Sequence, residues 1–599
     1  MKYLCVIFII GIAIVPGTDL AGKPLDSLHV RNPDSTRIIM DSETVPGAVR
    51  SRSHQMTILR PVGFFPREES GASGYWQMAP GPQYGRTILI HGLELDTRLR
   101  PGWPLRYFPQ HSLIGIAPVS TDSTGYPLRS HLLERREEPM VDLVYKEGDY
   151  GLSAVSVGVA TDITDDTHLH LSREGEGFVG QFGIDGLETE RYYLGVHHRV
   201  SDSTRFLYST FYARDNSTWT TATPAPNSFG SESSSWYQHL LRWNSQTRFG
   251  EWDYGLRLGS QRLWLNKTAE RGQMTELQRG GWLGYHFQLN NAIGIQWRYS
   301  GVQYVLDGSS SNLQRELWHR LQGGATIRFG EFSVKVHPEI VTVSTGDEVY
   351  VLPNGNVSYE PFDWITASVE LAGTVTPIPY QWEQTSEKIT IPTSSVEKTS
   401  TQNITSSLEI TPFNFLSVTG GAEFTQYSNW HSLAYNMPAA RTDSTLTLET
   451  VDGNHTGLFA SAKFQVFEEF ALGGRYDVYP SVSNILPELW TRQTITGWMQ
   501  AQRYFFDNNL LLHVYLEGGT LLSRQPVGWN PRFQSLTHYP LFGDPESSVF
   551  MHAIIQGQIG AFTISTSFYN AAANNLIYAL DQRPPATIFY LGVRWQLWN

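Results

Sequence analysis

The stretch Ile588–Trp598 reads IFYLGVRWQLW and decides the fold class of this chain. Apolar residues take every second position and small or polar residues fill the positions between them: Phe589, Leu591, Val593, Trp595 and Leu597 alternate with Tyr590, Gly592, Arg594 and Gln596, before Trp598. A period of two predicts a strand with one apolar and one polar face. Because terminal residues of soluble proteins usually fray, so aromatic a final strand indicates a barrel that it closes, with lipid outside and water inside.

Composition agrees with a strand-rich protein. The 599 residues are 13% aromatic and include 53 Gly, a balance that favours strands and turns over helices. The formal net charge of -13 argues against a nucleic-acid-binding protein, which would be basic.

Residues 1–21 are predicted to be a secretory signal peptide. Lys2 supplies the positive start, Leu4–Val15 the short apolar run, and Gly17 or Ala21 a small residue for cleavage. The alternative, a transmembrane helix, needs roughly 20 apolar residues, more than this run provides. The only cysteine, Cys5, lies in this segment, so disulfides and thiolate metal sites are not expected in the mature chain.

Short connections recur between alternating segments after Met140. They are rich in Gly, Asn and Asp and are often flanked by aromatics, as expected of tight turns at a membrane–water interface. Ten of them fall at 162–166, 201–204, 249–252, 289–292, 329–332, 362–364, 413–415, 467–470, 506–509 and 558–562. Long polar connections, such as 214–235, 381–405, 429–455 and 523–547, separate them.

The turn count predicts the size of the barrel. If both ends lie on the same side, n tight turns connect 2(n + 1) strands, so ten turns predict about 22 antiparallel strands over residues 139–599. Short turns on one side and long loops on the other are typical of outer-membrane barrels. A secreted β-propeller or multi-sandwich protein is the alternative, but it leaves the terminal aromatic strand unexplained.

Barrels of this width need a plug, and residues 49–138 precede the first predicted barrel strand. Within them, Arg86–Leu95 reads RTILIHGLEL, with Ile88, Leu89, Ile90, His91 and Gly92 at its centre. This resembles the strand–turn–strand of the plug domain in TonB-dependent outer-membrane receptors, with His91 in place of the family's Asp. The segments Leu105–Pro109 and Leu113–Ile116, the junction Glu138–Gly151 and the last hairpin from Asn574 are also similar to that family.

The resemblance implies an energy-coupling segment near the mature N-terminus. Residues 22–48 form the expected linker, and within it Asp26, Ser27, Leu28, His29 and Val30 are similar to the box that pairs with TonB by strand addition. The chain departs from the family in two places: 120–133 contains neither an Arg-Gly-Pro nor a Gly-Gly-Val-Ile-Asn-Ile motif, and the last residue is Asn599, one place after Trp598.

Histidines are the main candidates for metal chemistry. His168 and His170 share one face of a predicted strand, His197 and His198 are adjacent on another, and Asp165 and Asp166 are near. The simpler interpretation is that alternate polar residues line a lumen, with His197 and His198 on opposite faces, so we expect no metal or cofactor. There is no Gly-x-Ser-x-Gly elbow or phosphate-binding Gly-rich loop, so we predict that the protein is not an enzyme.

The sequence therefore predicts an all-β outer-membrane barrel with a short N-terminal plug. By resemblance, its function is import of a scarce solute across the outer membrane of a Gram-negative-type bacterium, with outer-membrane lipid, TonB and the barrel-assembly machinery as partners. Two alternatives stay open: a passive or gated porin-like channel with a plug remnant, and a surface-binding barrel without transport. The solute is not identified by the sequence.

Overall fold

The computed structural model describes most of the residues after Pro139 and short pieces before them. The described ranges are 64–66, 76–78, 87–90, 93–94, 115–116, 125–129, 139–178, 186–220, 229–267, 270–290, 292–308, 314–344, 348–376, 389–390, 398–436, 445–482, 491–524, 527–530, 535–538, 548–569 and 588–598. The predicted signal peptide and the segment Asp26–Val30 lie outside them. In the described residues, no helix is both long and apolar enough to cross a membrane.

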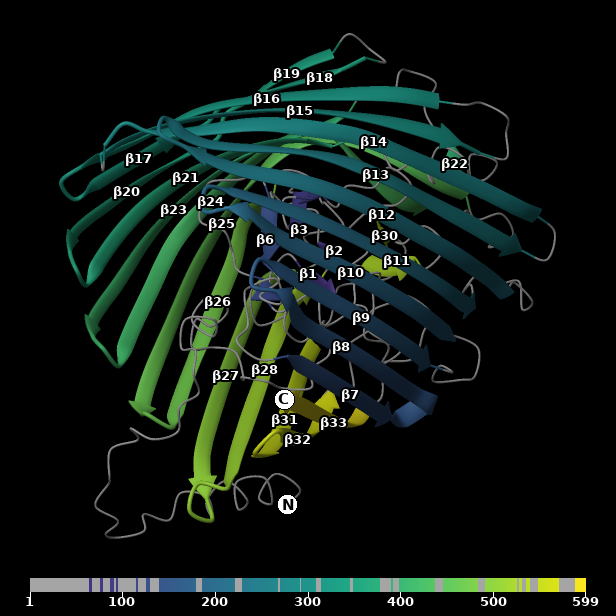
Figure 1. The fold of residues 1–599 in the computed structure, drawn as a ribbon, viewed down its shortest axis with the longest axis vertical. Helices are drawn as coiled ribbons and strands as arrows, with labels where there is room; N and C mark the ends of the chain where they lie inside the picture. Colours follow the sequence, from purple (N-terminus) through teal and green to yellow (C-terminus); the bar gives the residue numbers. More distant parts are fainter. Residues whose placement is uncertain are drawn as a thin grey trace. The chain divides into compact units, whose positions relative to one another are not determined.

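A closed antiparallel barrel contains nearly all of the described strands (Figure 1). Its first half consists of β7 (Met140–Gly148), β8 (Leu152–Thr164), β9 (Thr167–Phe178), β10 (Leu187–Ser201), β11 (Thr204–Thr220), β12 (Phe229–Thr247), β13 (Gly250–Lys267), β14 (Glu270–Gln288), β15 (Ile293–Asp307), β16 (Gln314–Phe329), β17 (Phe332–Val336) and β18 (Glu339–Val343). Its second half consists of β19 (Glu348–Leu352), β20 (Gly355–Phe362), β21 (Ile365–Thr376), β23 (Thr399–Phe413), β24 (Leu416–Asn436), β25 (Thr445–Phe467), β26 (Phe470–Val482), β27 (Thr491–Phe505), β28 (Leu510–Arg524), β31 (Ser548–Ile559), β32 (Phe562–Tyr569) and β33 (Ile588–Trp598).

These segments form 22 wall strands, which confirms the number predicted from the turns. Two wall strands are interrupted. β17 and β18 share one, with a break at His337-Pro338, and β19 and β20 share the next, with a break at Pro353-Asn354. Proline has no N–H to donate to a ladder, so a break at each proline is expected. The backbone N–H of His337 donates to the carbonyl of Asn354 across the two breaks, and the Asn354 side chain accepts from the N–H of Gly373, 2.9 Å in each case.

All ten predicted tight turns connect neighbouring strands, although the turn expected at 249–252 lies slightly earlier, between Thr247 and Gly250. At two of them, Gly330 and Gly560 adopt positive φ angles of 56° and 55°, which side chains disfavour. Aromatic rings crowd this end of the barrel. Phe413 stacks on Phe415 at a centroid distance of 5.0 Å, and Phe329 is 81% exposed. Such a ring of aromatics is expected at a membrane interface.

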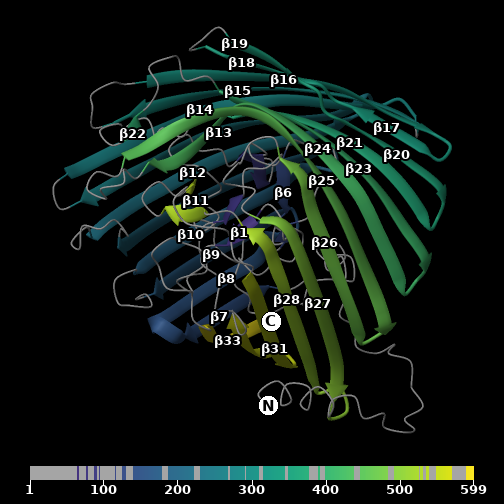
Figure 2. The same cartoon turned by 180° about the vertical axis from the view of Figure 1, so that it is seen from behind.

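The opposite end, called the loop side here, differs from the prediction. Much of the stretches 214–235 and 429–455 is paired strand rather than loop. β11 and β12 stay in register to Thr220 opposite Phe229, and β24 and β25 stay paired to Asn436 opposite Thr445, past a register shift between Tyr427 and Trp430. Figure 2 shows β24 and β25 from behind. These ends lie beyond the apolar part of the wall, and their sequences are rich in Ser, Thr and Asn, as in loops. The β7–β8 connection on this side is also short, Asp149–Gly151.

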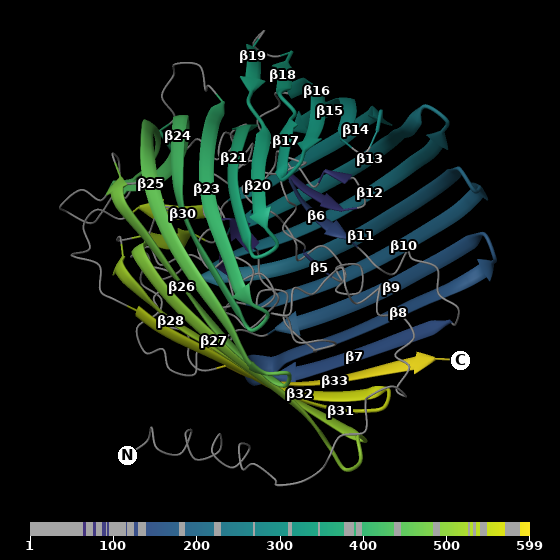
Figure 3. The same cartoon turned by 90° about the vertical axis from the view of Figure 1, so that its left-hand side faces the viewer.

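The terminal strand closes the barrel as predicted. β33 lies beside β7 (Figure 3) and pairs with it from Tyr590 to Trp598, along the whole length of β7, with Leu597 opposite Val141. The apolar side chains of Phe589, Leu591 and Trp595 are exposed on the outer surface. On the inner surface, Arg594 binds Asp142 through Nε (3.0 Å) and Nη2 (2.7 Å). This ion pair joins residues 452 positions apart and locks the seam of the barrel.

An apolar belt surrounds the outer surface of the wall. On β24 the outward positions run from Leu416 through Val418 to Phe424 and become polar at Gln426 and Ser428. On β25 they run from Phe467 to Leu458 and become polar at Thr456. Each belt segment therefore covers about ten residues from its tight turn, the length that a tilted strand needs to cross a membrane.

Two smaller sheets precede the barrel. β1 (Phe64–Pro66) pairs with β2 (Trp76–Met78), and a second sheet has the order β4-β3-β6-β5. Its members are β3 (Thr87–Ile90), β4 (Leu93–Glu94), β5 (Gly115–Ile116) and β6 (Gly125–Arg129). The barrel sheet also includes three short strands between wall strands: β22 (Ile389–Thr390), β29 (Val527–Asn530) and β30 (Ser535–His538).

Candidate functional site

The inner surface of the loop-side half, on β9 to β18, is the candidate functional site. Inward positions alternate with the exposed outward ones, and many of the inward side chains are charged yet buried. Seven carboxylates share this surface: Glu174, Glu176, Asp215, Glu232, Glu276, Glu316 and Glu339. Burying this many ionisable groups requires partners for them, since an unpaired buried charge costs several kcal/mol.

Arg191 on β10 is the main cation of this surface and is fully buried. Its Nη1 lies 2.5 Å from Oε1 of Glu174, and its Nη2 lies 3.0 Å from Oε2 of Glu176. The strand geometry produces this contact, because Glu174 is directly opposite Arg191 in the β9–β10 ladder and Glu176 is the next residue on the same face. One guanidinium therefore neutralises two neighbouring carboxylates.

This charged cluster belongs to a register row, that is, a line of residues that lie directly opposite one another on successive strands. From Glu174 and Arg191 the inward row continues through Ala213, Trp236, Gln261 and Glu276 to Leu306, each directly opposite the next. All of these residues are buried. The row therefore places acids, an amide and an indole on one continuous inward-facing surface.

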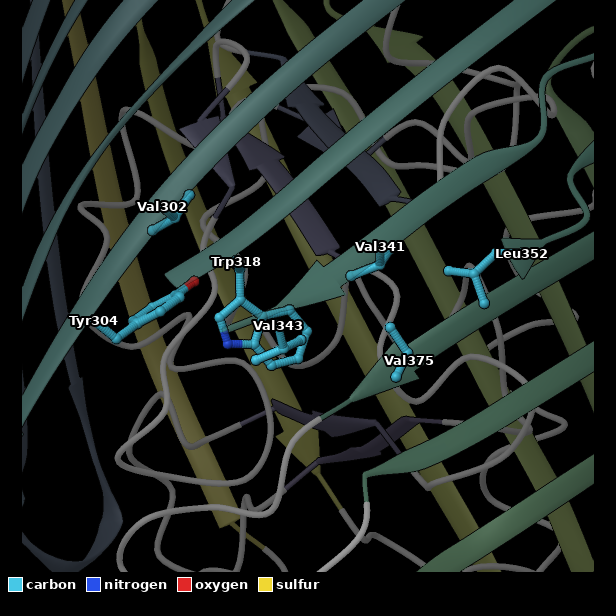
Figure 4. Close-up of a cluster of buried hydrophobic side chains, with 7 residues drawn as sticks. All are labelled: Val302, Tyr304, Trp318, Val341, Val343, Leu352 and Val375. Atoms are coloured by element: carbon cyan, nitrogen blue, oxygen red, sulfur yellow. The ribbon is translucent and has the colours of Figure 1, made fainter. Parts of the chain in front are cut away.

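Farther along the same wall, a cluster of buried side chains is apolar (Figure 4). The cluster consists of Val302, Tyr304, Trp318, Val341, Val343, Leu352 and Val375. Polar edges border it: the indole N–H of Trp318 donates to Glu316 at 3.0 Å, and Arg257 donates to the Tyr304 hydroxyl at 3.4 Å. The site therefore passes from charged on β9–β10 to apolar on β15–β21.

A second group of aromatic and imidazole side chains lies on the loop side of β24 to β26. Tyr427 and Trp430 are buried and pack edge to face, and the His455 ring lies 5.7 Å from that of Tyr479. His455 Nε2 is 3.7 Å from a carboxylate oxygen of Glu423. None of these residues was predicted as functional from the sequence, because only their shared inward face and cross-strand register bring them together.

The histidines considered for a metal site are partly brought together. His168 contacts Asp162, and its ring centroid lies 5.7 Å from that of His197, which is directly opposite in the ladder. His198 faces the other way and contacts Thr167 at 2.9 Å. The described residues include no group of three or more His, Cys, Asp or Glu side chains placed to hold a metal ion.

The other predicted site residues lie mostly outside the barrel wall or the described ranges. Ile88, Leu89 and Ile90 belong to β3, and β3 pairs antiparallel with β4, with Ile90 opposite Leu93. His91, Gly92 and the segment Asp26–Val30 are outside the described residues. Val593 and Leu597 are half-buried on β33, and Trp598 ends that strand.

Many solved structures have this architecture, whereas comparisons of the sequence find no match. No protein-family model matches the chain, and no curated protein matches it significantly. The structure is similar to the ferric enterobactin receptor PfeA, with a TM-score of 0.71 and 11% identity over 93% of this chain and 100% of that one. The copper transporter OprC gives a TM-score of 0.67 and 11% identity, covering 90% of this chain and 94% of that one.

The FrpB iron transporter from Neisseria meningitidis (F5-1 variant) matches in the same way, with a TM-score of 0.67 and 11% identity over 87% of this chain and 94% of that one. These structures are TonB-dependent outer-membrane receptors with closed barrels. At such low identity the likeness shows the fold, a 22-stranded transmembrane barrel, and the chain covers nearly the whole length of each of these structures.

Proposed function

We propose that this protein is an outer-membrane transporter that binds a scarce solute on the loop side of its lumen and imports it with energy supplied through TonB. The observation that carries the proposal is the closed 22-stranded wall with a charged, buried inner surface under an apolar outer belt. A barrel of this width has a lumen that needs a plug, whereas the lumen of a passive channel of 16 to 18 strands is open.

The N-terminal part of the chain supplies the remaining components of the proposal. Residues 1–21 direct export, Asp26–Val30 in the linker 22–48 pairs with TonB, and 49–138 forms the short plug. The antiparallel pairing of Leu89 and Ile90 with β4 supports the plug assignment, since the family's plug motif contains two such strands. The final strand, with Phe589, Leu591, Val593, Trp595, Leu597 and Trp598, serves as the signal for the barrel-assembly machinery. We propose no enzymatic activity.

The energy-coupling step is tested by cross-linking. The expected mature chain contains no cysteine, so Leu28→Cys introduces a unique thiol. We expect this variant to form a disulfide with a single-cysteine TonB domain, and a cysteine at Met40 in the same linker to remain unlinked. Equal cross-linking at both positions, or none at Leu28, would contradict strand addition at Asp26–Val30.

The passive channel is separated from the transporter by conductance. In planar bilayers with potassium chloride and no energy source, we expect the full chain to be silent and a variant lacking 49–138 to conduct. Steady conductance by the full chain would favour the porin-like channel with a plug remnant. Silence of both proteins would favour a surface-binding barrel without transport.

A further inference from the structure

Four arginines on the outer surface of the barrel are not explained by transport. Arg214 on β11, Arg262 on β13, Arg279 on β14 and Arg315 on β16 are all exposed and point away from the lumen. We call them the arginine arc. Their outward direction follows from alternation, because the residues beside them on each strand, such as Asp215, Leu263, Gln278 and Glu316, are buried on the inner side.

Arg214, Arg262 and Arg315 lie at the loop-side edge of the apolar belt, and Arg279 lies within the belt, opposite Leu258 on β13. Arg214 is opposite Ser235, and Ser235 is opposite Arg262, so the two arginines share a register row two strands apart, about 10 Å. The outward row one step nearer the tight turns consists of Tyr192, Tyr212 and Tyr237, each directly opposite the next. Exposed tyrosines at the end of an apolar belt indicate the level of the lipid headgroups.

The guanidinium groups of the arginine arc have no bonding partner among the described residues. In the part of the chain that the structure describes, no hydrogen bond or ion pair joins any of the four to another residue. The acids on this outer surface are Glu188 and Glu190 on β10 and Asp307 on β15. Glu190 faces Arg214 across the ladder, but its ion-pair contact is with Arg173, at 4.0 Å.

Strands β23 to β25, farther along the wall, lack this charge. On β23 to β25 the exposed outward positions at the same edge of the belt are Gln402, Gln426, Ser428, Asp452 and Asn454. None of these residues is basic. The arc of β11 to β16 is therefore not repeated on β23 to β25.

We propose that the arginine arc binds the phosphate groups of a phosphorylated glycolipid in the leaflet on the loop side. Guanidinium groups bind phosphate oxygens bidentately and snorkel from an apolar surface to the headgroup level. Ser235, Thr275 and Gln303 lie in register beside the arginines and offer hydroxyl and amide groups to the sugars between the phosphates. The inference rests on the membrane location in the proposed function, but not on solute binding or TonB.

The test measures lipid binding by the full-length, refolded barrel in detergent. Lipid A, a bisphosphorylated glycolipid, is the probe, with phosphatidylglycerol and inorganic phosphate as competitors, and bound lipid is counted by native mass spectrometry. We expect replacing all four arc arginines by glutamine to weaken lipid A binding by at least about tenfold. Replacing them by lysine keeps the positive charge but loses the planar group that makes two parallel hydrogen bonds. This variant should bind lipid A with intermediate affinity.

A matched control is available at the other end of the wall. Arg205, Arg248, Arg328 and Arg503 are also exposed, and they lie at or near tight turns. Their fourfold glutamine variant changes the net charge equally and should bind lipid A as the unmodified chain does. Equal binding by the arc variant, an equal loss in the control, or full competition by phosphatidylglycerol or inorganic phosphate would overturn the proposal. A heat-dependent shift in gel mobility verifies that each variant forms a closed barrel, and the lysine variant decides if the glutamine variant does not fold.

Discussion

The two faces of a single strand follow opposite rules in this protein, and β13 illustrates them. Leu256 and Leu258 point outward and are 62% and 57% exposed, while Arg257 between them points inward and is 4% exposed. A soluble protein would reverse this arrangement. The difference teaches that the outer surface is matched to lipid, where apolar side chains are stable when exposed, whereas the inner surface has to satisfy each buried charge through partners.

The largest expected effect comes from breaking the inner surface. Arg191→Met removes the cation shared by Glu174 and Glu176 and leaves two buried carboxylates without their main partner, which we expect to cost about 3–5 kcal/mol. The measurement is urea unfolding of the barrel in lipid vesicles. Arg199→Met is the control, since Arg199 pairs with Asp166 at an exposed turn, where solvent screens the pair and we expect a much smaller loss. Similar losses in both variants would show that burial does not distinguish the two sites.

A charge placed in the apolar belt is expected to destabilise the outer surface. Leu256→Arg puts a guanidinium among acyl chains, with an expected cost of about 2–4 kcal/mol in the same unfolding assay. Gln426→Arg, beyond the belt on β24, is expected to cost at most about 1 kcal/mol, because the headgroup region solvates the charge. If both substitutions cost the same, the proposed edge of the belt at Phe424 is wrong.

The seam between the first and last strands gives a smaller effect on the inner surface. Arg594→Gln removes the two-point contact to Asp142, which is buried, and we expect a loss of about 1.5–3 kcal/mol. Adding Asp142→Asn removes the uncompensated charge and should restore part of the stability. A double variant whose loss equals the sum of the single losses would indicate that the two groups are not coupled.

Acidification tests the burial of His431, which lies on the loop side beyond the apolar belt. Burial lowers the pKa of His431 to about 4, so the folded protein holds this ring neutral. The unfolded chain binds the proton near its ordinary pKa of about 6.5. The stabilisation is therefore complete above that pH and is lost as the pH falls toward 4, by about 1.4 kcal/mol per unit. Unfolding of the unmodified chain and of His431→Gln between pH 7 and 5 measures it. An identical slope in the two proteins would assign the acid sensitivity to other groups.

Sequence and structure contributed different parts of this description. The turns and the period of two in segments such as Ile588–Trp598 predicted the strand number, the closing strand and the lipid-facing side chains. The strand ends on the loop side were missed, because Ser- and Thr-rich strands such as the end of β11 lie outside the membrane and show no alternation to detect.

The candidate site was also missed from the sequence, for a related reason. Alternation is local, since it depends on neighbouring residues of one strand, and it says which face a side chain takes. Which side chains meet is set by the register between strands, which can be far apart in the chain. The sequence by itself therefore determined that Arg594 faces the lumen, but only the closed barrel placed it against Asp142, and only the β9–β10 register placed Arg191 between Glu174 and Glu176.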